Sequence, residues 1–399
     1  MALTAMMRSA SLRSVHVLPV EIPGGWRVRV EVEQAVRRRG WRLASGPADA
    51  DALVICGAPG SEWDELIDRV WGHLPGPRVR VTLANPAEVT GGLDRVVREL
   101  GDRDGQSVDA GQRRPDEDAA AFGSDRDTRG TSGMDMGDAP DGHDQHEESH
   151  HGDMDMGGYP DMGGMDMGGD PDMDMGDMDM DMAPSGIPLA TGADDRDGLE
   201  MDELHVPLGP VLRHWPAGLV VRCVLHGDLV TGAEVELLPG SGAADAVDVA
   251  AERAAGWCDS AASTLRLAGA ERPADRAVRL RDDLLDPTLA DRPETATGLA
   301  RLARDVRSSR VLRWSLGGLG VIATEVPGGP PTGDVHSRLC AQLDHALGAL
   351  RGDPAPALDA DGLRDALPGL MTGIDLAAAR LMVASVWPPA VVAREAAGV

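Results

Sequence analysis

The chain has 399 residues, a formal net charge of −28 and no lysine. Between residues 100 and 200 there are 28 Asp and Glu against 6 Arg, a local net charge of −22 that leaves the rest of the chain near −6. Nucleic-acid binding needs a basic footprint, so this charge balance excludes that class of partner. The length is typical of two domains.

The four cysteines, Cys56, Cys223, Cys258 and Cys340, are widely scattered, and no two form a CxxC pair. The spacings typical of metal and dithiol sites are therefore absent, and isolated thiols fit a reducing compartment. No apolar run approaches the roughly 18–20 residues of a membrane helix. We read no signal peptide at the N-terminus. We expect a cytoplasmic protein with no direct membrane span, with a peripheral position at the inner face of the cell membrane as an alternative.

Residues 14–100, after a flexible N-terminus of residues 1–13, predict a small α/β domain. Apolar strands are expected in SVHVLPVEI, ADALVICGAP and PRVRVTLANP. The segment WRVRVEVEQAVRRRGW places Val28, Val32 and Val36 at helical spacing, and EWDELIDRVWGHL and AEVTGGLDRVVREL predict further helices. Strands alternating with helices indicate a small parallel sheet with helices.

Residues 101–198 lack apolar periodicity and are dense in Gly, Asp, Met and Pro. Such a composition buries too little apolar surface to offset the entropy of the chain. We therefore predict a disordered acidic linker, rich in Met, Asp, Gly and His.

Residues 199–399 predict an α+β domain. Two strands, GLVVRCVLH and LVTGAEVELL, lie around GD, which is a strong hairpin signal. Five helical patterns follow, beginning at AADAVDVAAERAAGWC and ending with LPGLMTGIDLAAARLMVASV. An antiparallel hairpin followed by helices is typical of the α+β class.

The order of parts in the first domain resembles the iron–sulfur small subunit of nickel–iron hydrogenases and its relative in complex I (NADH:quinone oxidoreductase). The likeness is carried by ADALVICGAPGSEWDELIDRVWGHLPGPRVRVTLANPAEV: an apolar strand, a Gly-rich turn, a helix, a proline-containing turn and another strand.

The second domain resembles the large subunit of these hydrogenases and the quinone-site subunit of complex I. LGPVLRHWPAGLVVRCVLHGDLVTGAEVEL follows the opening hairpin of that family, and ERPADRAVRLRDDLLD its arginine-bearing helix. LPGLMTGIDLAAARLMVASVWPP is similar to its late helix and the turn after it. The chain thus looks like a fusion of two subunits.

The resemblance also implies metal ligands, which this chain lacks. In the small subunit, cysteines after the first and third strands hold a [4Fe–4S] cluster, but here those loops read EIPGGWR and LANPAEV. Two CxxC pairs hold nickel and iron in the large subunit, and none is present. Each cysteine of this chain is therefore interpreted as a core residue.

Because the cysteine ligands are missing, we expect the chain to act by binding other proteins and not to be an enzyme by itself. We predict a non-catalytic structural or assembly subunit of a complex-I-like or hydrogenase-like membrane oxidoreductase, with the membrane subunits of that complex as partners. The alternative is an electron-transfer or quinone-reactive oxidoreductase subunit that uses the cofactors of its partners. Fold analogy alone assigns neither.

In complex I, the quinone-site subunit offers a His in its opening hairpin, and a Tyr, to the quinone headgroup. The lone tyrosine, Tyr159, falls in the acidic linker, so the Tyr has no counterpart. His214 and His226 are the candidates to face a pocket, and a structural histidine is the alternative for each. Six tryptophans have two possible roles: they line an interface between the domains, or they are buried in the core of one domain. They are Trp26, Trp63, Trp71, Trp215, Trp314 and Trp387.

Twelve methionines occur from Met134 to Met182, with MDM recurring. Thioether sulfur suits Cu(I), and imidazole suits Cu(II), Zn and Ni. The segment therefore has two interpretations: a self-repelling tether, or a site for copper or another transition metal. The candidate ligands are His143, His146, His150, His151, Met154, Met156, Met162, Met165 and Met167.

Overall fold

A computed structural model describes residues 14–112, 191–194, 200–240, 250–290, 292–323, 331–354, 356 and 360–389. All of these ranges belong to one compact unit. We refer to residues 14–112 as the N-terminal half and to the described residues from 191 to 389 as the C-terminal half. No helix in the described ranges is both long and apolar enough to cross a bilayer.

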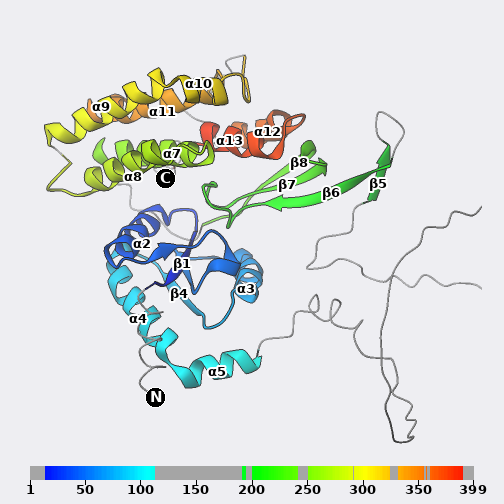
Figure 1. The fold of residues 1–399 in the computed structure, drawn as a ribbon, viewed down its shortest axis with the longest axis vertical. Coiled ribbons are helices and arrows are strands. Elements are labelled where there is room, and N and C mark those ends of the chain that lie inside the picture. Colours follow the sequence, from blue (N-terminus) through cyan, green and yellow to red (C-terminus); the bar gives the residue numbers. More distant parts are fainter. Residues whose placement is uncertain are drawn as a thin grey trace, which may run out of the picture. The chain divides into compact units, whose positions relative to one another are not determined.

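The N-terminal half contains a four-stranded parallel sheet in the order β2-β1-β3-β4 (Figure 1). The three predicted strands are present, and the sequence analysis missed only the two-residue edge strand β2. Every residue of β3 is buried, which fits its central place in a sheet covered on both faces. The strands are β1 (His16–Glu21), β2 (Arg42–Leu43), β3 (Ala52–Cys56) and β4 (Val79–Leu83).

Three predicted helices of this half are confirmed, with short 3₁₀ turns beside them. They form where apolar residues recur at helical spacing, as in Val89, Leu93 and Val96 on the buried face of α4. The helices are α2 (Trp26–Arg38), α3 (Asp64–Gly72) and α4 (Val89–Gly101), and the turns are η1 (Pro47–Asp49), η2 (Ser61–Trp63) and η3 (Pro86–Glu88).

Two elements fall inside residues 101–198, where we predicted no structure, so that prediction is wrong at both ends of the range. The first is α5 (Arg103–Gln112) and the second is strand β5 (Thr191–Asp194). Helix α5 has no buried residue, and a polar anchor holds it: the Gln106 amide oxygen accepts from the Arg78 backbone N–H at 3.0 Å. Apolar periodicity cannot reveal a helix held in this way.

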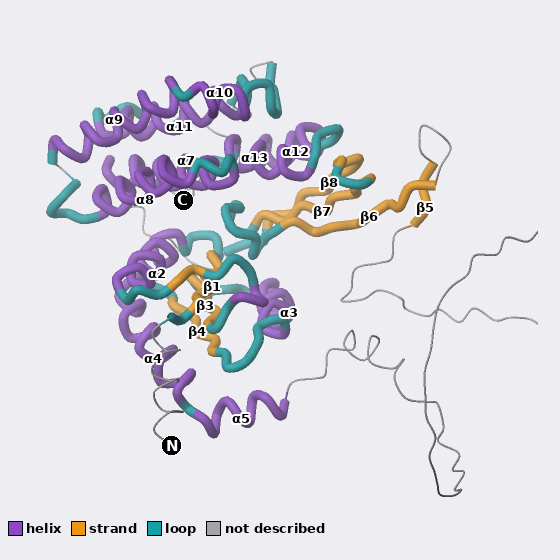
Figure 2. The backbone as a smooth tube through the Cα atoms, viewed as in Figure 1, coloured by secondary structure: helices purple, strands orange, loops and turns teal. Residues whose placement is uncertain are grey.

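The C-terminal half opens with an antiparallel sheet in the order β5-β6-β7-β8 (Figure 2). The predicted hairpin is confirmed as β7 and β8. The sequence analysis missed β6, whose sequence EMDELHVPL mixes charged residues with a proline. The strands after β5 are β6 (Glu200–Leu208), β7 (Leu219–His226) and β8 (Leu229–Leu237).

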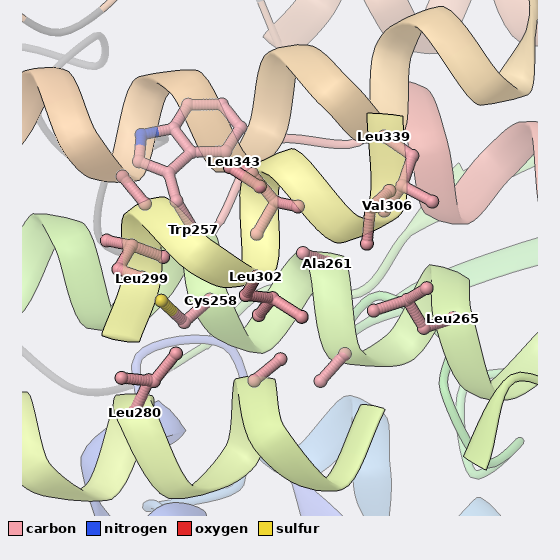
Figure 3. Close-up of a cluster of buried hydrophobic side chains, with 14 of the residues drawn as sticks. Trp257, Cys258, Ala261, Leu265, Leu280, Leu299, Leu302, Val306, Leu339 and Leu343 are labelled. Carbon is pink, nitrogen blue, oxygen red and sulfur yellow. The ribbon is translucent and has the colours of Figure 1, made fainter. Parts of the chain in front are cut away.

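Seven helices follow among the described residues, and most pack around one core (Figure 3). Side chains of α7, α8, α9 and α11 meet there, including Trp257, Leu302 and Leu343. Two predicted patterns each divide into two helices. The helices are α7 (Ala250–Leu267), α8 (Glu271–Leu285), α9 (Pro293–Ser308), α10 (Arg310–Leu316), α11 (Val335–Leu350), α12 (Ala360–Met371) and α13 (Leu376–Val386).

The predicted fold class is therefore confirmed: a small parallel α/β sheet with helices, then an antiparallel sheet with helices.

Candidate ligand cavity and charge network between the halves

Helix α2 is buried on two faces and belongs to both halves. Val28 and Val32 pack in the core of the parallel sheet. Trp26 and Val30 instead join the helical core of the C-terminal half. At 3.6 residues per turn, Val28 and Val30 point in different directions, so one helix can fill two cores. The two halves therefore pack through a shared apolar element.

A buried arginine on α8 holds carboxylates from both halves. Arg281 is 1% exposed. Its Nη1 donates to Glu33 Oε2 of α2 at 2.8 Å and to Asp259 Oδ1 of α7 at 2.6 Å. Its Nη2 donates to Asp282 Oδ1 at 2.9 Å. Such charge-assisted bonds give the junction geometric specificity as well as energy.

Arg29 of α2 completes the network from the N-terminal half. Its guanidinium donates to Glu21 at the end of β1, to Glu33, and across the junction to Asp259. The Trp26 indole N–H also donates to Asp259 Oδ2, at 2.9 Å. Asp259 thus receives donors from three side chains, two of them from the opposite half.

A second layer of contacts lies at the edge of this network. The Gln34 amide donates to Asp282 Oδ1 at 3.1 Å, and Arg37 forms an ion pair with the other oxygen of the same carboxylate. These contacts lie nearer to solvent, because the Arg37 side chain is 41% exposed. They extend the network from its buried centre towards the surface.

The carboxylates of the network differ in their proton affinity. Burial works to raise the pKa of Asp259 and of Glu33, but the neighbouring guanidiniums of Arg29 and Arg281 lower both, and they hold that of Asp259 well below its usual range. The pKa of Glu21 is raised, because burial outweighs the attraction of Arg29. Of these three carboxylates, Glu21 therefore takes up a proton most readily.

The network forms one wall of a cavity of about 560 Å³. Glu21, Arg29 and Asp259 line the polar wall. Trp215 and Trp387 contribute an apolar wall. A cavity of this size with an apolar side and a few convergent polar groups is the usual form of a small-molecule site.

His214 lines this cavity, from the loop between β6 and β7. It is the one residue other than glycine with a positive φ, 60°, within the described part of the chain. Burial and the nearby Arg213 lower the pKa of its imidazole to about 4, so the ring is neutral at pH 7. A neutral imidazole can donate from one nitrogen and accept at the other, and a strained backbone at such a position often accompanies function.

The second candidate histidine is not in the cavity. His226 lies at the end of β7, where its Nε2 is 3.8 Å from Glu203 Oε2. The structure thus assigns one predicted pocket residue to the cavity and gives the other a structural environment.

The tryptophans considered for the interface have different fates. The three that line the cavity are Trp26, Trp215 and Trp387. Trp63 is fully buried, and its indole N–H donates to the Pro239 carbonyl at 2.8 Å, which joins the halves at a second point. Trp71 is half-buried. Trp314 is exposed, so neither part of that prediction holds for it.

The four cysteines are free thiols, and three of them are buried in cores, as the sequence predicted. Cys56 is buried on β3, Cys223 on β7 and Cys258 on α7, each in a different core cluster, while Cys340 is half-buried on α11. Burial raises the pKa of Cys223 to about 11 and that of Cys258 to about 12. Such thiols stay protonated at neutral pH and pack as small apolar side chains.

The predicted copper ligands between residues 143 and 167 lie outside the described residues. Within the described residues, no group of three His, Cys, Asp or Glu side chains is placed to hold a metal ion. The copper site stays a prediction.

Sequence reasoning did not single out Arg29, Glu33, Asp259 or Arg281. One local signal was available: charged residues at i and i+4, Arg29 and Glu33, alternate with valines in WRVRVEVEQ. Charges placed inside an apolar pattern indicate buried partners. The identity of those partners, more than 200 residues away, has no local signal.

Comparison of this chain with family models, with curated proteins and with solved structures found no match. The resemblance to hydrogenase and complex I subunits therefore rests on the sequence motifs described above.

Proposed function

We propose that this chain is a non-catalytic structural or assembly subunit of a complex-I-like or hydrogenase-like membrane oxidoreductase. In this proposal the small-subunit-like and large-subunit-like halves act as one fused scaffold that docks onto membrane subunits of such a complex.

The observation that carries the proposal is the junction between the halves. Two separate subunits that pair need a specific interface, and here α2 supplies Trp26 and Val30 to the core of the C-terminal half. Arg281, Glu33 and Asp259 add a buried network that joins the same surfaces. A junction of this kind supports a fused pair better than two independent modules on a tether, because independent modules need no shared core.

The thiols support the non-catalytic part of the proposal. Cys56 is the thiol nearest in sequence to the loops in which the resemblance expects cluster ligands. It lies within β3, and its Sγ donates weakly to the Val54 carbonyl, 3.6 Å away. Burial raises its pKa well above the ordinary range. A thiol in this environment packs as a small apolar side chain.

The test is co-purification of the full chain, carrying an affinity tag, from native membranes solubilised in a mild detergent. We expect membrane subunits of a complex-I-like or hydrogenase-like type to elute with it in fixed stoichiometry. Membranes from cells that express the untagged chain are the control. An eluate that contains this chain alone contradicts the proposal.

The cavity favours a second candidate function, that of a quinone-reactive subunit that uses partner cofactors. Its lining combines apolar tryptophans with a neutral histidine, His214, in the loop that leads into the hairpin. In the resembling family a histidine of the opening hairpin meets the quinone headgroup. A headgroup carbonyl can accept a hydrogen bond from a neutral imidazole.

This second candidate is tested by titrating the purified chain with a short-chain quinone and following tryptophan fluorescence. The variant His214→Gly removes the ring and tolerates the positive φ. We expect it to weaken binding by up to roughly tenfold, the value of one hydrogen bond. His226→Ala is the matched control and is expected to bind as the native chain does. Equal binding by all three proteins contradicts a role for His214.

A further inference from the structure

Helix α9 has two chemically opposite faces. Leu299, Leu302 and Val306 point into the helical core (Figure 3). Arg301 and Arg304 lie on the surface and are exposed. This is the ordinary pattern of a surface helix, and the next helix departs from it.

The next helix, α10, exposes large apolar side chains. Val311 is 72% exposed and Trp314 is 86% exposed, and a spacing of three residues places them on the same side of the helix. Val321, shortly after the helix, is 58% exposed. The other seven tryptophans of the chain are buried or half-buried, so the exposure of Trp314 is exceptional within this molecule.

Exposed arginines surround these apolar residues along the chain. Arg310 and Arg313 of α10 are exposed, as are Arg301 and Arg304 of α9, and none of the four forms an ion pair with a described carboxylate. Arg307, by contrast, pairs with Asp344 at 2.6 Å. We call Arg310, Val311, Arg313 and Trp314 the α10 patch. It is basic and apolar on a chain whose net charge is −28.

We propose that the α10 patch docks this protein onto the surface of an anionic phospholipid bilayer. Tryptophan prefers the headgroup level of a membrane, where its ring is amphipathic. Basic side chains near it are attracted to anionic headgroups. The α10 patch does not line the cavity that contains His214, and a soft bilayer accepts protruding side chains without a matching pocket.

This inference goes beyond the proposed function, because it concerns the chain alone with lipid. The test uses the purified full chain and sedimentation with vesicles of phosphatidylcholine, either pure or mixed with phosphatidylglycerol. We expect binding to the mixed vesicles and little to the pure ones. Salt should weaken the binding, because the screening length falls from about 10 Å at 0.1 M to about 3 Å at 1 M.

Two variants separate the basic and the apolar contributions of the patch. Arg310→Glu with Arg313→Glu should weaken binding to the mixed vesicles at least about 30-fold, since each arginine contributes roughly fivefold. Trp314→Ser should weaken binding by a factor that does not change with salt, because the apolar contribution is not screened. The matched control is Arg98→Glu with Arg103→Glu, the same charge change on exposed arginines of the N-terminal half. It should bind within about twofold of the native chain.

The inference is overturned if the chain binds neither kind of vesicle. It is also overturned if the α10 variant and the control variant lose the same amount of binding to the mixed vesicles. A patch that binds an acidic protein but no vesicle would also overturn it. Because the assay contains no partner subunits, a chain that binds vesicles and yet co-purifies with no membrane subunit would refute only the proposed function.

Discussion

Two buried arginines in the C-terminal half show two ways to hold a charge away from water. Arg281 of α8 and Arg338 of α11 are both 1% exposed. Arg281 meets the carboxylates of Glu33, Asp259 and Asp282. Arg338 meets neutral oxygens instead: its Nε donates to Ser385 Oγ at 2.9 Å and its Nη1 donates to a backbone carbonyl. Its Nη2 has no hydrogen-bond partner among the described residues.

Their pKa values move in opposite directions. Burial works against the charge of both, but the adjacent carboxylates raise the pKa of Arg281 above its ordinary value. Burial lowers the pKa of Arg338 to about 10, with only Asp334 acting against it. The buried arginine that is paired with carboxylates is therefore the one that lies where the two halves meet.

The largest effect is expected from breaking the compensated site. Arg281→Ala leaves Glu33 and Asp259 short of a buried counter-charge, so we expect a loss of about 3–5 kcal/mol in the free energy of unfolding. Urea unfolding of the full chain measures it. Arg276→Ala is the matched control on the same helix, and its exposed pair with Asp305 should be worth less than about 1 kcal/mol. Equal losses would show that the network does not hold the halves together.

A pH titration tests the wall of the same cavity. The pKa of His214 is lowered from 6.5 to about 4 in the folded chain, so the unfolded chain binds the proton more tightly. Its contribution to stability is complete above pH 6.5 and is lost as the pH falls towards 4, by at most about 3 kcal/mol. The free energy of unfolding, plotted against pH over this range, should have a smaller slope in the variant His214→Asn. Asparagine tolerates the positive φ at this position. An unchanged slope would assign the titration to other groups.

A smaller effect is expected at the arginine held by neutral groups. Arg338→Met replaces a poorly compensated charge by an apolar side chain, which offsets the hydrogen bonds lost to Ser385 and a carbonyl. We expect the free energy of unfolding to change by less than about 1 kcal/mol, in the same urea assay. A loss as large as that of Arg281→Ala would remove the contrast between the two sites.

A small effect on folding is also expected from deleting residues 134–182, which lie outside the described residues. The unfolding free energy should rise by less than about 1 kcal/mol, because closing a shorter loop costs less entropy and loop length enters only logarithmically. Metal analysis of both proteins accompanies the measurement. Copper held by the full chain and lost in the deletion would confirm the predicted Met/His site, whereas no copper in either protein would leave a tether.

The sequence by itself determined the elements whose apolar residues repeat along the chain. Strands β1, β3 and β4, the β7–β8 hairpin and the faces of α2 and α4 follow from local patterns, because each must bury one side. The core role of Cys56 and the candidate pocket histidine His214 were also accessible. Strand β6 and helix α5 were missed, because a mixed strand and a helix held by Gln106 have no apolar period.

Only the tertiary structure decided which charged residues meet. Arg29 and Asp259 are separated by 230 positions, and nothing local distinguishes them from surface charges. The same applies to the tryptophans. Trp26 lines the cavity and Trp314 is exposed, although each lies next to an arginine in a helical pattern. Burial depends on what packs against a residue from elsewhere in the chain, and a local pattern contains no information about that neighbour.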